Sequence, residues 1–232
     1  MRALLLLPLL GLFAGCESVA DVVTKQKPAV EKTFTALTAL GPKVTATPEF
    51  TKLEVKAPAV PLKLDGDGAN AVYVYADDLA KPGRAAEVAV RSIDTLPLLH
   101  CGSLLEKQQY FNDGFTRLSP SIVNGYLEAC AKARYALVIR NQQFLRPELS
   151  LETKQFAPAK WRADVLVFDL TTGDALGGFP VVATNDSRVS LLDGDQDHVK
   201  RILENLESCV FDAIRDGTRA AFPGSLKAKE AK

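Results

Sequence analysis

The sequence has little of the material from which catalytic and metal centres are built. Only two of its 232 residues are histidines, His100 and His198, and only four are cysteines. It contains no GxSxG, HExxH, SxxK, P-loop or GxGxxG motif, each of which would mark a specific chemistry. The sequence therefore predicts no catalytic residue, no metal site and no cofactor.

An excess of charge of one sign is also lacking. Lys and Arg together number 28, as do Asp and Glu, so the formal net charge at pH 7 is zero. A protein that binds nucleic acid through its phosphates needs a basic face, and we therefore expect no nucleic acid partner. Hydrophobic residues make up 47% of the chain, which is typical of a globular protein that buries a core.

Long apolar runs are scarce, and the clearest one stands at the N-terminus. Residues 3–14 are almost wholly apolar and follow one positive charge, at Arg2. A membrane-spanning helix needs roughly 20 apolar residues, so this run is short for one. A charged start, a short apolar middle and small residues at its end are the layout of a secretory signal peptide.

The end of this run, with the sequence LFAGC, resembles the lipobox of bacterial lipoproteins. Ala14 and Gly15 match the pattern, whereas Phe13 stands where that family usually has Leu. The resemblance implies that residues 1–15 are a signal peptide and that the thiol of Cys16 is lipidated after cleavage. Several acyl chains would hold such a protein at the membrane almost permanently.

The residue after the cysteine bears on the location. In the lipoprotein family, an Asp at that place tends to retain the protein in the inner membrane. Glu17 stands there in this chain, so the resemblance implies an outer-membrane protein that faces the periplasm, with the membrane as its partner through the lipid anchor. Two alternatives stay open. An ordinary secretory signal cut near Gly15 would give a periplasmic or secreted protein, and an uncleaved run would give an apolar N-terminal helix.

The remaining cysteines predict one disulfide. If Cys16 carries lipid, three others stand in an oxidising compartment, where disulfides persist. They are too far apart in the sequence for a CxxC motif or a metal clip. Cys101 lies in or beside one predicted helix and Cys130 ends the next, and two such antiparallel elements would bring the thiols within reach. We predict a Cys101–Cys130 disulfide and a buried thiol at Cys209.

Composition divides the mature chain into a stalk, a linker, a domain and a tail. Residues 17–41 show two apolar helical stripes that Pro28 is expected to interrupt, and they form either a docked helix pair or a semi-ordered stalk. Residues 42–68 are rich in proline and predict an extended linker. We expect a lipid-anchored helical stalk and linker over 16–68, a single domain over 69–224 and a charged tail over 225–232.

Strand and helix patterns follow one another within the domain. β-Branched and aromatic residues predict strands at 71–76 and 135–140. A glycine turn predicts a β-hairpin near 163–183, and a loop is expected around 147–158. Strands joined by short turns favour an α+β fold, with an antiparallel meander covered by helices.

Helical spacing predicts the covering elements. Helices are expected around 96–109 and from Ser119 onwards. Apolar residues from Val199 to Ile214 repeat at helical spacing and predict a long amphipathic C-terminal helix.

An acidic cluster precedes that last helix. Asp193, Asp195 and Asp197, with Glu204, have the spacing of an EF-hand calcium loop, but His198 stands where the loop needs glycine. We interpret the cluster as negative charge at a helix N-terminus, which the helix dipole favours.

The other histidine, His100, adjoins Cys101. Neighbours in sequence rarely converge on one metal or act as nucleophile and base, so we interpret His100 as a surface residue beside a disulfide. These observations favour a membrane-anchored envelope lipoprotein with a non-enzymatic interaction or structural role and an envelope protein as a partner. The alternative is a periplasmic small-ligand-binding protein or an enzyme whose site only the fold would assemble.

Overall fold

The computed structural model describes residues 17–64, 68–83, 96–106, 118–150, 155–186, 189 and 198–223. Within these ranges the helices are α1 (Val19–Thr38), α2 (Gly41–Ala46), α3 (Leu96–Glu106), α4 (Pro120–Ala131) and α5 (His198–Ala221), with a short 3₁₀ helix at Ala76–Asp78. The strands are β1 (Ala71–Tyr75), β2 (Tyr135–Leu145), β3 (Glu148–Ser150), β4 (Gln155–Ala157), β5 (Lys160–Asp169) and β6 (Ala175–Thr184). The predicted α+β class is confirmed.

Four of the described strands form one sheet in the order β1-β2-β5-β6. β2, β5 and β6 make an antiparallel meander, and β5 and β6 are the predicted hairpin, closed by a turn in which Gly173 has a positive φ of 71°. β1 pairs with β2 in parallel, so the expectation of a wholly antiparallel sheet is wrong. The segment between β1 and β2 contains α3 and α4, and a long crossover of this kind returns the chain in the same direction.

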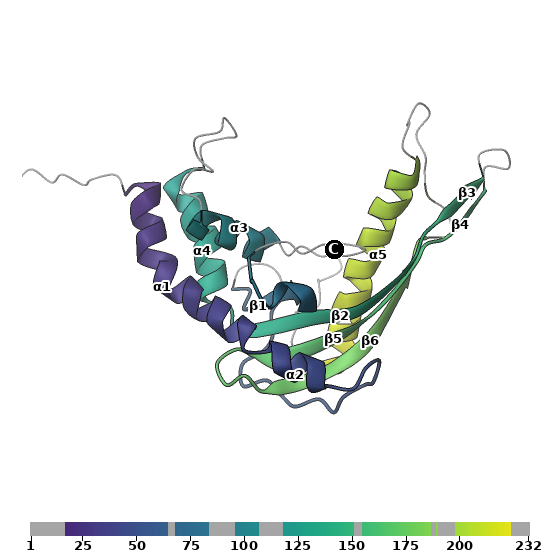
Figure 1. The fold of residues 1–232 in the computed structure, drawn as a ribbon, viewed down its shortest axis with the longest axis horizontal. Helices are drawn as coiled ribbons and strands as arrows, with labels where there is room; N and C mark the ends of the chain where they lie inside the picture. The colour runs from purple at the N-terminus through teal and green to yellow at the C-terminus, as the bar shows by residue number, and fades with distance from the viewer. Residues whose placement is uncertain are drawn as a thin grey trace, which may run out of the picture.

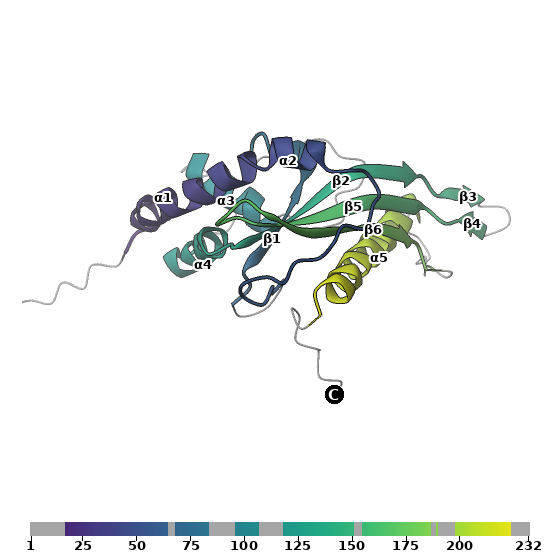
Figure 2. The ribbon, with the colours of Figure 1, turned by 90° about the horizontal axis from the view of Figure 1, so that it is seen from below.

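β3 and β4 lengthen two strands of the sheet into a ribbon. Leu145 at the end of β2 is opposite Lys160 at the start of β5, and Glu148 is opposite Ala157 a few residues further along. The ribbon extends past the rest of the sheet, as both ribbon views show (Figures 1 and 2). The expectation of an irregular loop over 147–158 is therefore wrong for the residues in β3 and β4.

Helices cover both faces of the sheet, because side chains on both faces are apolar. Tyr73, Leu137 and Val165 belong to the core that α5 covers, whereas Val138 and Leu166 belong to the core beneath α1, α3 and α4. The predicted C-terminal helix is confirmed. Its stripe of fully buried side chains consists of Ile202, Leu206, Val210, Ile214 and Thr218.

The segment before β1 packs on the domain. α1 runs without a break through the exposed Pro28, so the expected interruption is wrong. The helix is docked on the domain, but it is one helix and not the helix pair that we expected as one alternative. In the proline-rich segment, Leu62 and Leu64 are buried. The backbone N–H of Leu53 donates to the carbonyl of Gly178 in β6 at 2.9 Å.

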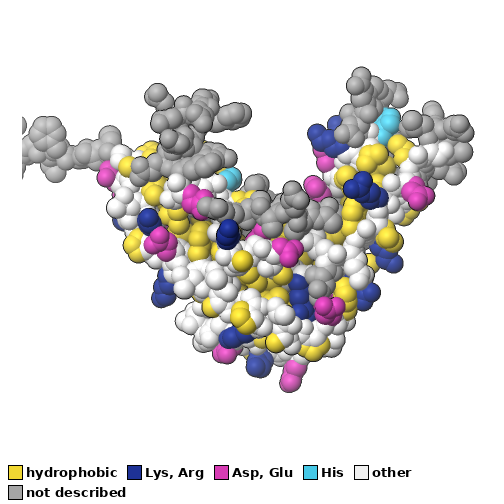
Figure 3. Space-filling model, viewed as in Figure 1, with side chains coloured by type: hydrophobic (Ala, Val, Ile, Leu, Met, Phe, Trp, Pro, Cys, Tyr) yellow, Lys and Arg dark blue, Asp and Glu magenta, His cyan; other side chains and the backbone are white. Residues whose placement is uncertain are grey.

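The molecule has the outline of a V. α1, α3 and α4 lie on one arm, and α5 and the β3–β4 ribbon lie on the other (Figure 1). The same view in space-filling form is hollowed between the arms, and basic and acidic side chains are interspersed on it (Figure 3). This mixture agrees with the zero net charge of the sequence.

Candidate functional site

The residue with a predicted chemistry, Cys16, lies outside the described residues, and the described chain begins beside it at Glu17. The N-terminus of α1 follows at once and is closed by a capping box. The Ser18 hydroxyl accepts from the backbone N–H of Asp21 at 3.2 Å, and the Asp21 carboxylate accepts from the backbone N–H of Ser18 at 3.0 Å. A side-chain cap of this kind stabilises a helix by about 1 kcal/mol.

The capping box also affects the acidity of Asp21. Hydrogen bonds from the hydroxyl and then from the backbone N–H of Ser18 hold the pKa of the Asp21 carboxyl below its ordinary value. The carboxylate therefore keeps its negative charge in the first turn of α1, where the helix dipole favours it.

α1 is held on the domain through α4. Val23 and Val30 of α1 and Val123 and Leu127 of α4 are buried in the same core. Where the interface reaches the surface, the side-chain amide of Gln26 donates to the Asn124 side-chain oxygen at 2.9 Å.

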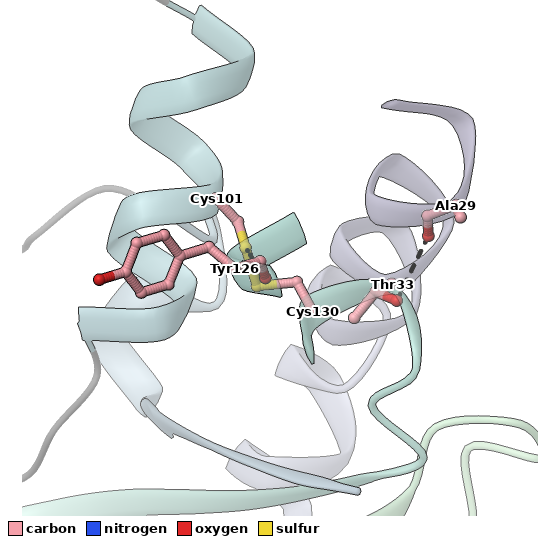
Figure 4. Close-up of a disulfide and its surroundings, with 5 residues drawn as sticks. All are labelled: Ala29, Thr33, Cys101, Tyr126 and Cys130. Atoms are coloured by element: carbon pink, nitrogen blue, oxygen red, sulfur yellow. Dashed lines mark hydrogen bonds between the residues drawn. A yellow bond between two sulfur atoms is a disulfide. The ribbon is translucent and has the colours of Figure 1, made fainter. Parts of the chain in front are cut away.

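A disulfide connects α4 to α3. The structure joins Cys101 of α3 to Cys130 of α4, which is the predicted pair, and both residues are fully buried. Figure 4 shows that Cys130 lies next to Thr33 of α1, whose hydroxyl donates to the carbonyl of Ala29 at 3.4 Å. The disulfide thus lies where α1, α3 and α4 meet.

The two histidines differ in what the structure shows. His100 packs edge-on against the ring of Tyr126, with ring centroids 4.7 Å apart. It is half-buried and not the open surface residue that we expected. His198 begins α5, and Cys209 further along α5 is half-buried rather than fully buried. Burial raises the pKa of the Cys209 thiol, so this thiol is not activated as a nucleophile.

Of the acidic cluster, only Glu204 lies among the described residues. Asp193, Asp195 and Asp197 lie outside the described residues. Glu204 is on α5, where its carboxylate pairs with Arg201 at 3.4 Å. Within the described ranges, no group of three or more His, Cys, Asp or Glu side chains is placed to hold a metal ion.

A buried ion pair was missed by the sequence analysis. Arg140 of β2 and Asp164 of β5 face each other with the Arg140 Nε 3.4 Å from the Asp164 Oδ2, and their side chains are 6% and 3% exposed. The Arg140 guanidinium also donates to the backbone carbonyls of Val44, Thr47 and Pro48.

The Asp164 side of the ion pair also binds the same segment, at Phe50. The Asp164 carboxylate accepts from the backbone N–H of Phe50 at 2.7 Å. The sequence held one signal of this pair, because Arg140 and Asp164 are charged residues within otherwise apolar strands, YALVIR and ADVLVF. The pair holds residues 44–50 on the sheet through hydrogen bonds to their backbone, so its role is structural.

Comparison with protein-family models, with curated proteins and with solved structures finds no match. Among the described residues, no helix combines the length and the apolar character that crossing a bilayer requires.

Proposed function

We propose that the chain is an envelope lipoprotein of a bacterial outer membrane, with its lipid on Cys16 and its domain facing the periplasm. The observation that carries this proposal is the sequence of residues 1–16, with its charged start, short apolar run and LFAGC end. The work of the domain is a non-enzymatic interaction or structural role with an envelope protein.

The fold supports this proposal in two ways. A fully buried disulfide between Cys101 and Cys130 suits an oxidising compartment such as the periplasm. The capped helix α1 begins directly after Glu17, so a chain cleaved before Cys16 would keep every described element.

Replacement of Cys16 tests the anchor. We expect Cys16→Ser to move the protein from the membrane fraction to the soluble periplasmic fraction, because a serine cannot carry the thioether-linked lipid. Cys209→Ser is the matched control, because it removes a thiol from α5 and leaves the anchor, and it should stay in the membrane fraction. Retention of Cys16→Ser in membranes after a salt wash would contradict the proposal.

A further inference from the structure

The distance between the lipidation residue and the folded domain is very short. Ser18, the cap of α1, is two residues after Cys16. Two residues of extended chain span at most about 7 Å. Because the capping box fixes where α1 begins, the chain cannot gain reach by unwinding without losing these hydrogen bonds. A lipid on Cys16 therefore holds the first turn of α1 close to the headgroups.

The first turn of α4 lies at the same end of the molecule. Gln26 of α1 contacts Asn124 of α4, and Thr33, further along α1, lies beside Cys130, further along α4 (Figure 4). The two helices therefore run in parallel, and both ribbon views place their N-termini at one end (Figures 1 and 2). The buried contacts between the helices prevent either from turning away independently.

The side chains at this end suit a headgroup layer. Ile122 in the first turn of α4 is 48% exposed and offers an apolar group, and Ser119 and Ser121 beside it are exposed hydroxyl residues. Few charges lie there. Glu17 and Lys25 are exposed and form an ion pair at 3.6 Å, and the Asp21 carboxylate accepts hydrogen bonds from Ser18 within the capping box. Residues 18–22 and 120–124 contain no Lys or Arg, so an exposed apolar side chain and exposed hydroxyls would contact the lipid surface here without a need for anionic lipid.

The β3–β4 ribbon lies at the opposite end of the long axis. Figures 1 and 2 place the first turn of α1 at one extreme and the ribbon at the other. Leu145, where β2 passes into this ribbon, is the most exposed large hydrophobic residue among those described, at 65%. It provides a reference position far from the anchored end.

We propose that the end formed by the first turns of α1 and α4 (residues 18–22 and 120–124) rests on the lipid headgroups, and that the β3–β4 ribbon is held away from the membrane. This inference rests on the proposed lipidation of Cys16. It adds to that proposal the surface of the domain that contacts the membrane and the orientation of the domain. Both follow from the two-residue distance between Cys16 and the cap of α1.

Fluorescence quenching in vesicles tests this orientation. The lipidated full chain, extracted from its own membranes, carries Cys209→Ser and one labelling site, either Ile122→Cys or Leu145→Cys. Each variant is labelled with an environment-sensitive fluorophore and placed in phosphatidylcholine vesicles that contain a headgroup spin label. We expect a loss of most of the fluorescence at residue 122 and no loss at residue 145. Equal quenching at the two positions, or stronger quenching at 145, would overturn the inference.

A lengthened tether provides the control. A flexible Gly-Ser insert of about 20 residues between Glu17 and Ser18 spans roughly 25 Å, and we expect it to abolish most of the quenching at 122 while the protein stays bound to vesicles. Unchanged quenching would overturn the inference that the short tether sets the orientation. The mass of the same sample separates the two proposals. A chain without lipid overturns both, whereas a lipidated chain with equal quenching overturns only the orientation.

Discussion

Arg140 and Asp164 show how single charged residues organise the fold. Burying a charged pair removes both groups from water, and the cost is offset only where further hydrogen bonds satisfy them. Here the guanidinium and the carboxylate bind backbone groups of the segment from Val44 to Phe50. Val44 is the one core residue of this segment, and the residues after it are exposed or half-buried, so the ion pair helps to fix the segment on the sheet.

We expect Arg140→Met to destabilise the domain by about 3–5 kcal/mol, because it removes the positive charge that faces the buried Asp164 carboxylate. Urea denaturation followed by circular dichroism measures the change. Arg219→Met is the matched control, because the Arg219–Asp216 pair is exposed, and such pairs contribute less than about 1 kcal/mol. Similar losses of unfolding free energy in the two variants would show that the buried pair stabilises the domain no more than an exposed pair does.

A close backbone contact gives a second prediction at this scale. A Cβ added at Gly102 in α3 would stand 2.3 Å from the carbonyl oxygen of Gly83, whereas one added at Gly125 in α4 would meet nothing within 4 Å. Gly102→Ala should cost about 1–3 kcal/mol through overpacking, and Gly125→Ala should gain about 0.5–1 kcal/mol. Thermal melting of the two variants gives the comparison. A stable Gly102→Ala protein would show that α3 does not pack so closely on residue 83.

At the scale of elements, α1 shows why a proline was misread. A proline inside a helix removes one hydrogen bond and costs about 3 kcal/mol, so the sequence alone favours a break at Pro28. Val22, Val23, Val30 and Leu37 are all buried on one side of the same helix, and their packing across the proline outweighs that cost. Local rules do not contain this tertiary contribution.

The sequence predicted some features of the sheet and not others. Alternating and apolar patterns located β2, β5, β6 and α5, because each buries a face that sequence periodicity records. The direction of β1 was not available in this way, because the residues of a strand do not encode whether its neighbour runs parallel. β3 and β4 were missed because they are short and flanked by prolines, which are common in loops.

The disulfide between α3 and α4 should contribute to stability by restricting the unfolded chain. A loop of 29 residues corresponds to about 3–4 kcal/mol of unfolded-state entropy. The double variant Cys101→Ala and Cys130→Ala should lose stability on that scale in urea denaturation, and Cys209→Ala, the control on α5, should lose much less. Thiol counting in denaturant, without reductant, should find one reactive group in the lipidated protein. Three reactive groups would contradict the bridge.

At the scale of the whole molecule, fold and function were not equally predictable. The α+β class follows from apolar periodicity, which is a property of the sequence. The buried Arg140–Asp164 ion pair and the junction of α1, α3 and α4 depend on contacts between residues that are distant in the sequence, so only the structure shows them. The proposed function rests on residues 1–16, whose sequence resembles the signal peptide and lipobox of a bacterial lipoprotein. The described domain supports the further proposal that its α1–α4 end faces the membrane.

The mass of the intact protein, extracted from its own bacterial membranes, tests the central claim most directly. The account predicts a chain that starts at Cys16 and carries a diacylglyceryl group and a further acyl chain. A bare chain cut near Gly15 would contradict it and would make the protein a free periplasmic or secreted one. A chain that still holds residues 1–15 would contradict it as well, because cleavage precedes the acylation of the new N-terminus.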